Sequence, residues 1–151
     1  MSRKPLLTFP PLIEGTLLKR YKRFIADVEL DDGEIVTAHC ANTGPMTGVL
    51  HIGSRVRLRY SPSPKRKLVW TWEQAEVQTK QGNSCWVGVN TSLPNNIVKL
   101  AIQAGCLINE LGPVEEIRGE VVYGLNGRSR IDLLLTPGVN ALIPKKIYVE
   151  I

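Results

Sequence analysis

The chain has 151 residues, 43% of them hydrophobic, and a formal net charge of +5. It is long enough to bury the core of one domain or of two small ones. Its three cysteines, Cys40, Cys85 and Cys106, are far apart, which argues against a disulfide scaffold or a zinc ribbon and fits a reducing cytosol. The sequence shows no signal peptide and no bilayer-spanning apolar run, so we expect a soluble, cytoplasmic protein without membrane contact.

The excess positive charge lies in the first half of the chain. Residues 1–82 contain 13 Lys and Arg against 8 Asp and Glu, whereas residues 83–151 contain 6 of each kind. Six of the nine aromatic residues also lie in the first half. A basic segment with aromatic residues indicates a polyanionic partner, most simply nucleic acid. The alternative is that this modest excess only aids solubility.

Short strands separated by turns are predicted first along the chain. One strand has an apolar face formed by Phe24, Ala26, Val28 and Leu30. Asp32-Gly33 then predicts a tight hairpin turn, because glycine tolerates the positive φ angle of such turns, and residues 35–40 form the returning strand. A loop rich in glycine and proline follows at residues 42–48.

The clearest strand is residues 55–60. Its alternation predicts a core side with Val56, Leu58 and Tyr60 and an exposed side with Arg55, Arg57 and Arg59. The next run, residues 68–77, carries Trp70 and Trp72 on one face, which we expect to be buried. Five short strands over residues 11–82 favour an OB-like five-stranded barrel, a fold that binds nucleic acids.

Residues 83–151 are predicted to begin an α/β domain after a boundary near residues 81–84. A strand at 85–89 leads to a helix that Ser92 can cap, that has Pro94 in its first turn and that Gly105 ends. The buried stripe of this helix is predicted to be Ile97, Leu100, Ala101 and Ala104. Three strands follow, with turns at Asn126-Gly127 and near Pro137.

Basic residues near aromatic ones form three patches in the first half. Nucleic-acid binding needs this mixture, because cations displace counterions from phosphates while aromatic rings stack on unpaired bases. The candidate phosphate contacts are Arg20, Lys22, Arg23, Arg55, Arg57, Arg59, Lys65, Arg66 and Lys67. The alternative is a solvated sheet face with the aromatic rings inside the barrel.

Two acidic residues lie on apolar runs that read as neighbouring strands. Asp132 and Glu150 are candidate ligands for Mg²⁺ or Mn²⁺, because carboxylate oxygens suit hard cations. The alternative is an ion pair of Asp132 with Arg128 or Arg130. Glu120 is a third candidate: it faces Asp132 if the hairpin loop is centred on Asn126, and it points away if the loop is only Asn126-Gly127.

His39 and Cys40 invite a metal or nucleophile interpretation. Neighbours on a strand point to opposite faces, however, so the two cannot easily bind one metal, and no second ligand pair has zinc spacing. We therefore expect Cys40 to fill the core, and Asn42, Thr43 and Gly44 to shape the following loop.

Several blocks of the sequence resemble the sugar fermentation stimulation protein A (SfsA) family. They are Arg20-Tyr21-Lys22-Arg23-Phe24, Asp27-Val28, His39-Cys40, Asn42-Thr43-Gly44-Pro45-Met46-Thr47-Gly48, Arg66-Lys67, Thr71-Trp72-Glu73, Val89-Asn90-Thr91, Val122-Tyr123-Gly124, Ser129-Arg130-Ile131-Asp132 and Tyr148-Val149-Glu150-Ile151. The resemblance implies an OB-like barrel followed by a restriction-endonuclease-like domain of the PD-(D/E)xK type. It also implies DNA binding and a link to the regulation of sugar (maltose) metabolism.

In that nuclease-like pattern, Asp132 matches the metal-binding aspartate and Glu150 the first residue of the Glu-x-Lys pair. The lysine of the family pattern would follow Ile151, so we expect the second domain to be truncated. We predict a DNA-binding protein, for which a homodimer is one allowed state. The alternatives are a metal-dependent nuclease when the protein is full length, and a regulatory adaptor with a vestigial acidic site.

Overall fold

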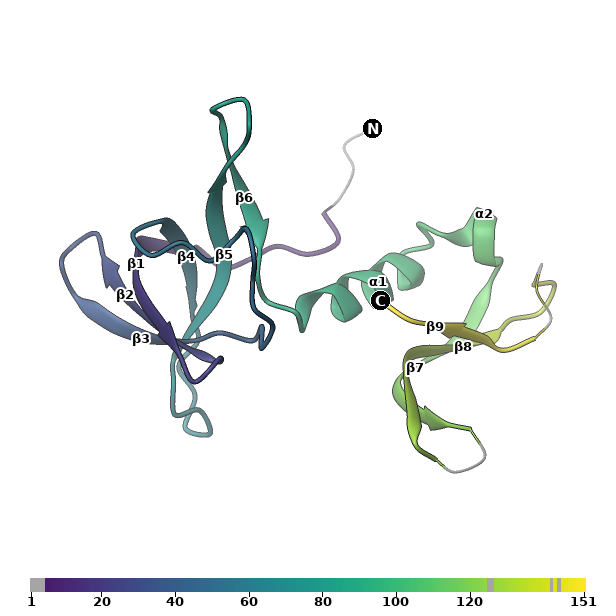
Figure 1. The fold of residues 1–151 in the computed structure, drawn as a ribbon. Helices are drawn as coiled ribbons and strands as arrows, with labels where there is room; N and C mark the ends of the chain where they lie inside the picture. The colour runs from purple at the N-terminus through teal and green to yellow at the C-terminus, as the bar shows by residue number, and fades with distance from the viewer. Residues whose placement is uncertain (1–4, 125–126, 142, 144) are drawn as a thin grey trace. The chain divides into compact units, whose positions relative to one another are not determined.

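The computed structural model describes residues 5–124, 127–141, 143 and 145–151. It divides into two compact units, which Figure 1 shows as a strand-rich part and a part that contains the helices. One unit is Phe9–Thr91, and the other is Ser92–Ile151 together with the segment up to Thr8. Among the described residues, no helix combines the length and apolar character needed to cross a membrane.

The first unit contains an OB-type five-stranded barrel, as the sequence predicts. Its strands are β1 (Ile13–Tyr21), β2 (Ile25–Leu30), β3 (Ile35–His39), β4 (Arg55–Tyr60) and β5 (Trp70–Gln78). The strand order is β3-β2-β1-β4-β5, with antiparallel neighbours throughout. A parallel pairing of β3 with β5, through Ala38↔Trp70 and His39↔Thr71, closes the barrel.

A sixth strand, β6 (Ser84–Gly88), extends the sheet of the barrel. It pairs antiparallel with β5, for example through Ala75↔Val87. The sequence places the domain boundary after Gly82, whereas the contacts in the structure divide the chain after Thr91. The difference arises because β6 completes its hydrogen bonds on the barrel instead of on the second unit.

Buried side chains confirm most of the predicted barrel core. Val56, Leu58, Trp72 and Cys40 are all fully buried. The indole N–H of Trp72 donates to the carbonyl of Gln74 at 2.8 Å, so burial leaves no polar group of this ring without a partner.

Two aromatic residues that the alternation places in the core are exposed instead. Phe24 is 45% exposed because it lies in the turn before β2, where strand alternation does not apply. Tyr60 is 49% exposed at the last position of β4, where its ring packs on that of Trp70 at a centroid distance of 4.8 Å. Trp70 itself is half-buried against the core.

The second unit is a three-stranded antiparallel sheet with two helices. Its elements are α1 (Leu93–Gln103), α2 (Ile108–Leu111), β7 (Val114–Tyr123), β8 (Ser129–Pro137) and β9 (Ile147–Val149). The sheet order is β7-β8-β9. The predicted turn residue Asn126 lies outside the described residues. The nuclease-like interpretation of this unit stays a prediction.

Helix α1 uses a different face from the predicted one. Ser92 takes the N-cap position, although its side chain forms no capping hydrogen bond, and Pro94 lies in the first turn. Val98 and Ile102 pack against the sheet with Leu133 and Leu135, whereas Ile97 is exposed. Both stripes have helical spacing, and the position of the sheet decides between them.

Gly15 lies where β1 and β2 approach most closely. A Cβ atom at this position would lie 2.6 Å from the carbonyl oxygen of Glu29 and 2.6 Å from Val28 Cγ1. Such distances force the two strands apart, and one of the two obstacles is backbone that cannot rotate away. The barrel therefore requires glycine here for space.

We predict that Gly15→Ala destabilises the barrel by about 1–3 kcal/mol through overpacking. The measurement is urea unfolding followed by tryptophan fluorescence, because Trp70, Trp72 and Trp86 all lie in the barrel unit. Gly88→Ala is the matched control, since a Cβ at Gly88 meets no atom within 4 Å. Equal effects of the two substitutions would contradict the close approach at Gly15.

Candidate functional site

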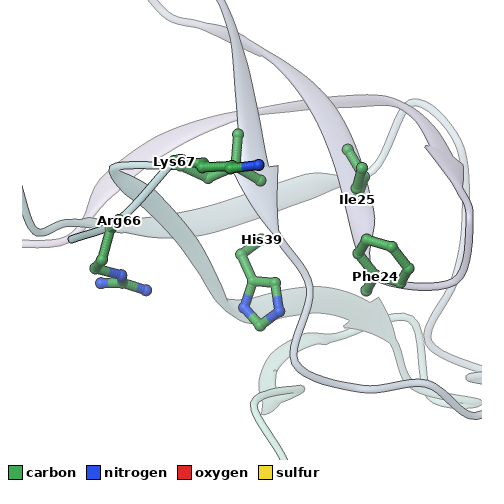
Figure 2. A pocket seen from close by; sticks show the side chains of 6 residues that line it. Phe24, Ile25, His39, Arg66 and Lys67 are labelled. Atoms are coloured by element: carbon green, nitrogen blue, oxygen red, sulfur yellow. The ribbon is translucent and has the colours of Figure 1, made fainter.

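A cleft of about 550 Å³ opens between two connections of the barrel. One is the turn between β1 and β2, and the other is the loop between β4 and β5. Figure 2 shows Phe24 and Ile25 on one side, Arg66 and Lys67 on the other, and His39 between them. We call this site the barrel cleft; its lining residues are Phe24, Ile25, His39, Arg66, Lys67 and Leu68.

The turn beside the barrel cleft is held in an unusual backbone conformation. Lys22 and Arg23 have φ angles of 50° and 66°, in the left-handed region that residues with a side chain rarely adopt. Arg20 stabilises this turn, because its Nη2 donates to the carbonyl of Arg23 at 2.6 Å. The same nitrogen donates to the carbonyls of Asn42 at 2.7 Å and Gly44 at 2.9 Å. Arg20 therefore joins the turn to the loop after β3.

Five cations on the two connections that border the barrel cleft have no carboxylate partner in the described part of the chain, and two of them, Arg66 and Lys67, line the cleft itself. The five are Lys22, Arg23, Lys65, Arg66 and Lys67. Four of them are exposed, and Arg66 is half-buried with its Nη2 donating to Thr71 Oγ1 at 3.0 Å. These positive charges are available to a ligand, because no acidic side chain among the described residues forms an ion pair with them.

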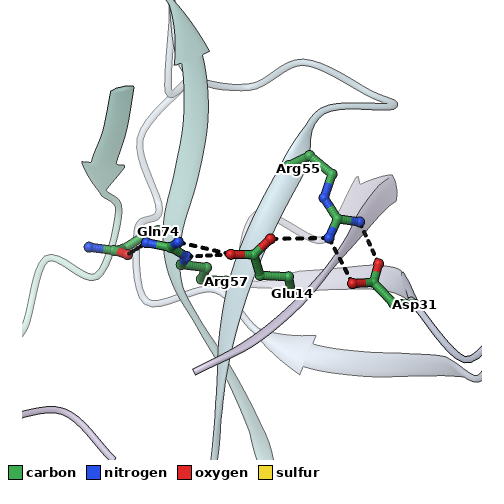
Figure 3. A network of polar contacts seen from close by, with 5 residues as sticks. All are labelled: Glu14, Asp31, Arg55, Arg57 and Gln74. Carbon is green, nitrogen blue, oxygen red and sulfur yellow. Dashed lines mark hydrogen bonds and ion pairs between the residues drawn. The ribbon is translucent and has the colours of Figure 1, made fainter. Parts of the chain in front are cut away.

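The three arginines of β4 lie on the outer face, as the sequence predicts, but each has a carboxylate partner. Arg55 makes two contacts with Asp31, at 2.6 Å and 2.9 Å, and one with Glu14 at 3.2 Å. Arg57 donates twice to Glu14, at 2.9 Å and 2.8 Å. Figure 3 shows these groups as one chain of contacts that ends at Gln74.

The other contacts of this arginine stripe, Arg55, Arg57 and Arg59, reach β5 and β6. The guanidinium of Arg57 lies 3.9 Å from the ring centre of Trp86, a cation–π contact. Arg59 donates to Glu73 at 2.7 Å, and this buried carboxylate also accepts from Asn90 at 2.9 Å. The arginine stripe thus ties four strands of the barrel together.

These contacts shift the ionisation of the groups that form them. The hydrogen bonds from Arg57 and then Arg55 lower the pKa of Glu14, and the hydrogen bond from Arg55 lowers the pKa of Asp31. In turn, Asp31 and then Glu14 raise the pKa of Arg55, against the opposing effect of burial. The network therefore stays charged throughout the neutral range.

We predict that the Glu14 network loses its contribution to stability in acid. A carboxylate whose folded pKa is lowered contributes fully above its unfolded pKa of about 4.3, and the contribution disappears as the pH falls through the folded value. Glu14→Gln should therefore lower the free energy of unfolding by about 1 kcal/mol or less at pH 7, because solvent screens this partly exposed pair.

Below the folded pKa of Glu14, the difference between Glu14→Gln and wild type should vanish. The measurement is urea unfolding at several pH values, with Glu34→Gln as the control at an exposed glutamate that has no ion pair in the described part of the chain. A pH-independent difference would show that the ionisation of Glu14 is not involved.

The second unit positions Asp132 at the centre of its sheet. Asp132 Oδ1 accepts from Nδ2 of Asn95 in the first turn of α1 at 2.9 Å. Its Oδ2 accepts from the backbone N–H of Ile151 at 2.8 Å. The register Leu133↔Val149, continued by one residue, sets Glu150 opposite Asp132. Directly opposed residues share a face of an antiparallel sheet.

Glu120 does not join these two residues as a third ligand. The pairs Gly119↔Leu133 and Val121↔Ile131 set it opposite Asp132, which is the register of the hairpin loop centred on position 126. Its φ angle is 54°, however, and its carboxylate accepts from Arg130 at 3.3 Å. Across the residues that the structure describes, no three His, Cys, Asp or Glu side chains form a metal-binding group.

The blocks around Cys40 have a structural role. Cys40 is buried, and Asn42 Oδ1 accepts from the backbone N–H of Gly44 at 2.9 Å, which shapes the loop. Thr91 Oγ1 donates to the carbonyl of Ala41 at 2.8 Å and fastens the same loop to the end of the barrel unit. His39 is different, because it lines the barrel cleft.

Sequence reasoning missed two residues of these sites. His39, considered only as a metal ligand or nucleophile, lines the barrel cleft. Phe24 lines it too, and it belongs to the basic and aromatic cluster at residues 20–24 that the sequence marks as a candidate. Asn95 contacts Asp132, but no signal in the sequence marks it, because the contact depends on how α1 is rotated against the sheet.

Comparisons with known proteins agree with this description. Residues 18–89 match the family model of the SfsA N-terminal OB domain. The chain is 68% identical over 147 residues to a sugar fermentation stimulation protein homolog of Prochlorococcus marinus (strain MIT 9303), covering 97% of this chain and 57% of that relative. This chain belongs to the SfsA family. A homolog from Synechococcus sp. (strain WH7803) is 64% identical over 151 residues, covering all of this chain and 59% of that relative.

The fold is also similar to a solved structure of the family. SfsA of Pyrococcus furiosus, determined in complex with Ca²⁺, matches with a TM-score of 0.75 and 20% identity over 98% of this chain and 57% of that chain. At this identity, the likeness concerns the fold. The chain spans 57% to 60% of the length of these relatives.

Proposed function

We propose that this SfsA-family chain binds DNA through its OB barrel and belongs to a protein that regulates sugar (maltose) metabolism. The observation that carries the DNA-binding part is the grouping, on the two connections that border the barrel cleft, of five cations without an ion pair among the described residues. The name of the curated relatives, sugar fermentation stimulation protein homolog, supports the link to sugar metabolism.

The position of the barrel cleft fits this proposal. OB barrels bind oligonucleotides on the face of their second and third strands, between the loop that joins strands 1 and 2 and the loop that joins strands 4 and 5. Here Ile25 comes from β2, His39 from β3, Phe24 from the first of these loops, and Arg66 and Lys67 from the second. The free cations therefore lie where this fold accepts a phosphate backbone.

The arginine stripe is assigned a structural role in this proposal. Arg55, Arg57 and Arg59 already donate to Asp31, Glu14 and Glu73, so a phosphate would have to displace a carboxylate from each. Arg20 is likewise committed to three backbone carbonyls. The phosphate contacts are therefore expected from the five cations of the barrel cleft.

We predict that DNA affinity falls with salt and that removing Lys65 and Lys67 together reduces this dependence. Each phosphate contact contributes about 0.7 to the slope of log K against log salt on a single strand and about 0.9 on a duplex. Lys65→Gln with Lys67→Gln should therefore lower the slope by about 1.4 to 1.8. Fluorescence anisotropy with a labelled oligonucleotide measures this change.

The matched control is Lys145→Gln with Lys146→Gln, which removes the same charge from the other unit. This double variant should keep the wild-type slope. If both double variants lowered the slope equally, the binding would follow net charge and the barrel cleft would not be the site.

A second candidate function is a metal-dependent nuclease in the full-length protein, with Mg²⁺ or Mn²⁺ at the acidic site. The observation that favours it is the pairing of β8 with β9, whose register, continued by one residue, sets Glu150 opposite Asp132, together with the hydrogen bond from Asn95 to Asp132. Oxygen donors of this kind suit hard divalent cations. The Ca²⁺ in the solved structure of the Pyrococcus furiosus relative supports a cation in this family. Such a cation would polarise a phosphate or activate a water.

We predict that this chain binds Ca²⁺ or Mn²⁺ through Asp132 and Glu150. Asp132→Asn should abolish the binding, and Asn95→Ala should weaken it about 10- to 100-fold, because a partner that orients a ligand carries that much of the affinity. Calorimetric titration measures both effects, with Glu110→Gln as an exposed acidic control. Unchanged binding by Asp132→Asn would place the cation elsewhere.

A further inference from the structure

The barrel cleft joins an apolar wall to a basic one. Phe24 and Ile25 supply apolar surface on one side, while Arg66 and Lys67 supply positive charge on the other (Figure 2). Leu68 adds apolar surface from the same loop as the two cations. A ligand that fills it must combine a flat apolar part with a negative charge. Its volume of about 550 Å³ lies in the range of sites that enclose small organic groups.

We propose that the barrel cleft binds single-stranded DNA, with an unpaired base stacked on Phe24 and the flanking phosphates on the surrounding cations. The proposal rests on the DNA-binding function above and specifies the form of DNA that the site accepts. It assigns to Phe24 and His39 a role in contacting bases, separate from the role of the cations.

Phe24 is the group that offers a stacking surface to a base. Its ring is 45% exposed, although most phenylalanine side chains of a barrel belong in the core, and it lies at the tip of a hairpin turn. Exposure of this ring to water is not stabilising, whereas stacking on the face of an unpaired base is. Such stacking is possible with any of the bases. His39, between the two walls, adds a second flat ring with polar nitrogens.

The cations lie on both sides of this stacking surface. Lys22 and Arg23 directly precede Phe24 in the turn between β1 and β2, and Lys65, Arg66 and Lys67 belong to the loop between β4 and β5. Figure 2 shows Arg66 and Lys67 across the barrel cleft from Phe24. A single strand that crosses the barrel cleft can therefore place a phosphate on each side of a base stacked on Phe24. The left-handed turn held by Arg20 fixes Lys22 and Arg23 in this position.

A duplex does not fit this arrangement. Its bases are paired and stacked on one another, so Phe24 could reach a base face only after the pair is broken. The other basic surface of the barrel is the arginine stripe, and its guanidinium groups are already bound to carboxylates. The available charge thus borders an apolar cleft.

The test is fluorescence anisotropy of the 151-residue chain with a labelled oligothymidine of about 15 nucleotides, near the upper site size of one OB fold. Two further probes are a blunt duplex and an oligonucleotide of the same length whose central positions are abasic. The variants are Phe24→Ala, which removes the ring, and Phe24→Trp, which keeps a stacking face. Ile35→Ala is the control, because Ile35 is an exposed apolar residue that does not line the barrel cleft.

We expect Phe24→Ala to weaken oligothymidine binding roughly 5- to 150-fold, the range for loss of one stacked base. Phe24→Trp and Ile35→Ala should bind like wild type, and the abasic probe should bind weakly and equally to all four proteins. Unlabelled single strand should compete, and duplex should compete poorly. Thermal unfolding of each variant verifies that the barrel is intact.

Other outcomes would overturn this inference, and they show whether the proposed function fails with it. Duplex binding at least as tight as single-strand binding, with no loss in Phe24→Ala, would overturn the inference and leave DNA binding by the barrel standing. Absence of binding to every probe at low salt would overturn both. Equal loss for Phe24→Ala and Ile35→Ala would also overturn the inference, because it would trace the effect to general apolar contact.

Discussion

The parallel pairing of β3 with β5 is the contact on which the candidate DNA site depends. It links strands that are separated by the whole of β4, and it converts an open sheet into a barrel. By setting His39 beside Thr71, it also brings the end of β3 to the start of β5, directly after the basic loop. The barrel cleft exists because this closure places three distant segments at one end of the barrel.

The cations of this barrel have two roles, and the presence or absence of a neighbouring carboxylate decides between them. Glu14 and Asp31 lie beside the arginines of β4, so those cations stabilise the sheet. The loops at the barrel cleft contain no carboxylate in ion-pairing reach among the described residues, so their cations face solvent. Net charge alone does not distinguish these roles, because both sets count equally in the total of +5.

Local patterns predicted the strands, the OB-type barrel and the burial of Trp72 and Cys40 correctly. They failed where an element ended: Phe24 precedes β2 in the turn and Tyr60 is the last residue of β4, and both are exposed although they follow the apolar alternation of their strands. The prediction of the buried face of α1 was wrong for a different reason. The helix has two apolar stripes, and the position of the sheet decides which of them is buried.

The partners of charged residues were the least predictable part. Glu14 and Arg57 are 43 residues apart, and Asn95 and Asp132 are 37 apart, so each contact requires the complete strand order or helix placement. The sequence predicts that Asp132 and Glu150 lie on neighbouring strands; β8 and β9 do pair, and their register, continued one residue past the end of β9, sets the two opposite each other. Spacing along one strand therefore predicts orientation well, and partner choice across the fold poorly.

The hydrogen bonds of Arg20 affect the free energy that binding loses in ordering the turn. Association usually loses free energy when a mobile loop is ordered on its ligand. Here the guanidinium of Arg20 already binds the carbonyl of Arg23 in the turn and two carbonyls of the loop after β3. The side chains on the turn therefore need to order only their own rotamers. The free-energy cost of the left-handed residues is compensated when the protein folds. The turn is therefore already ordered when a ligand binds.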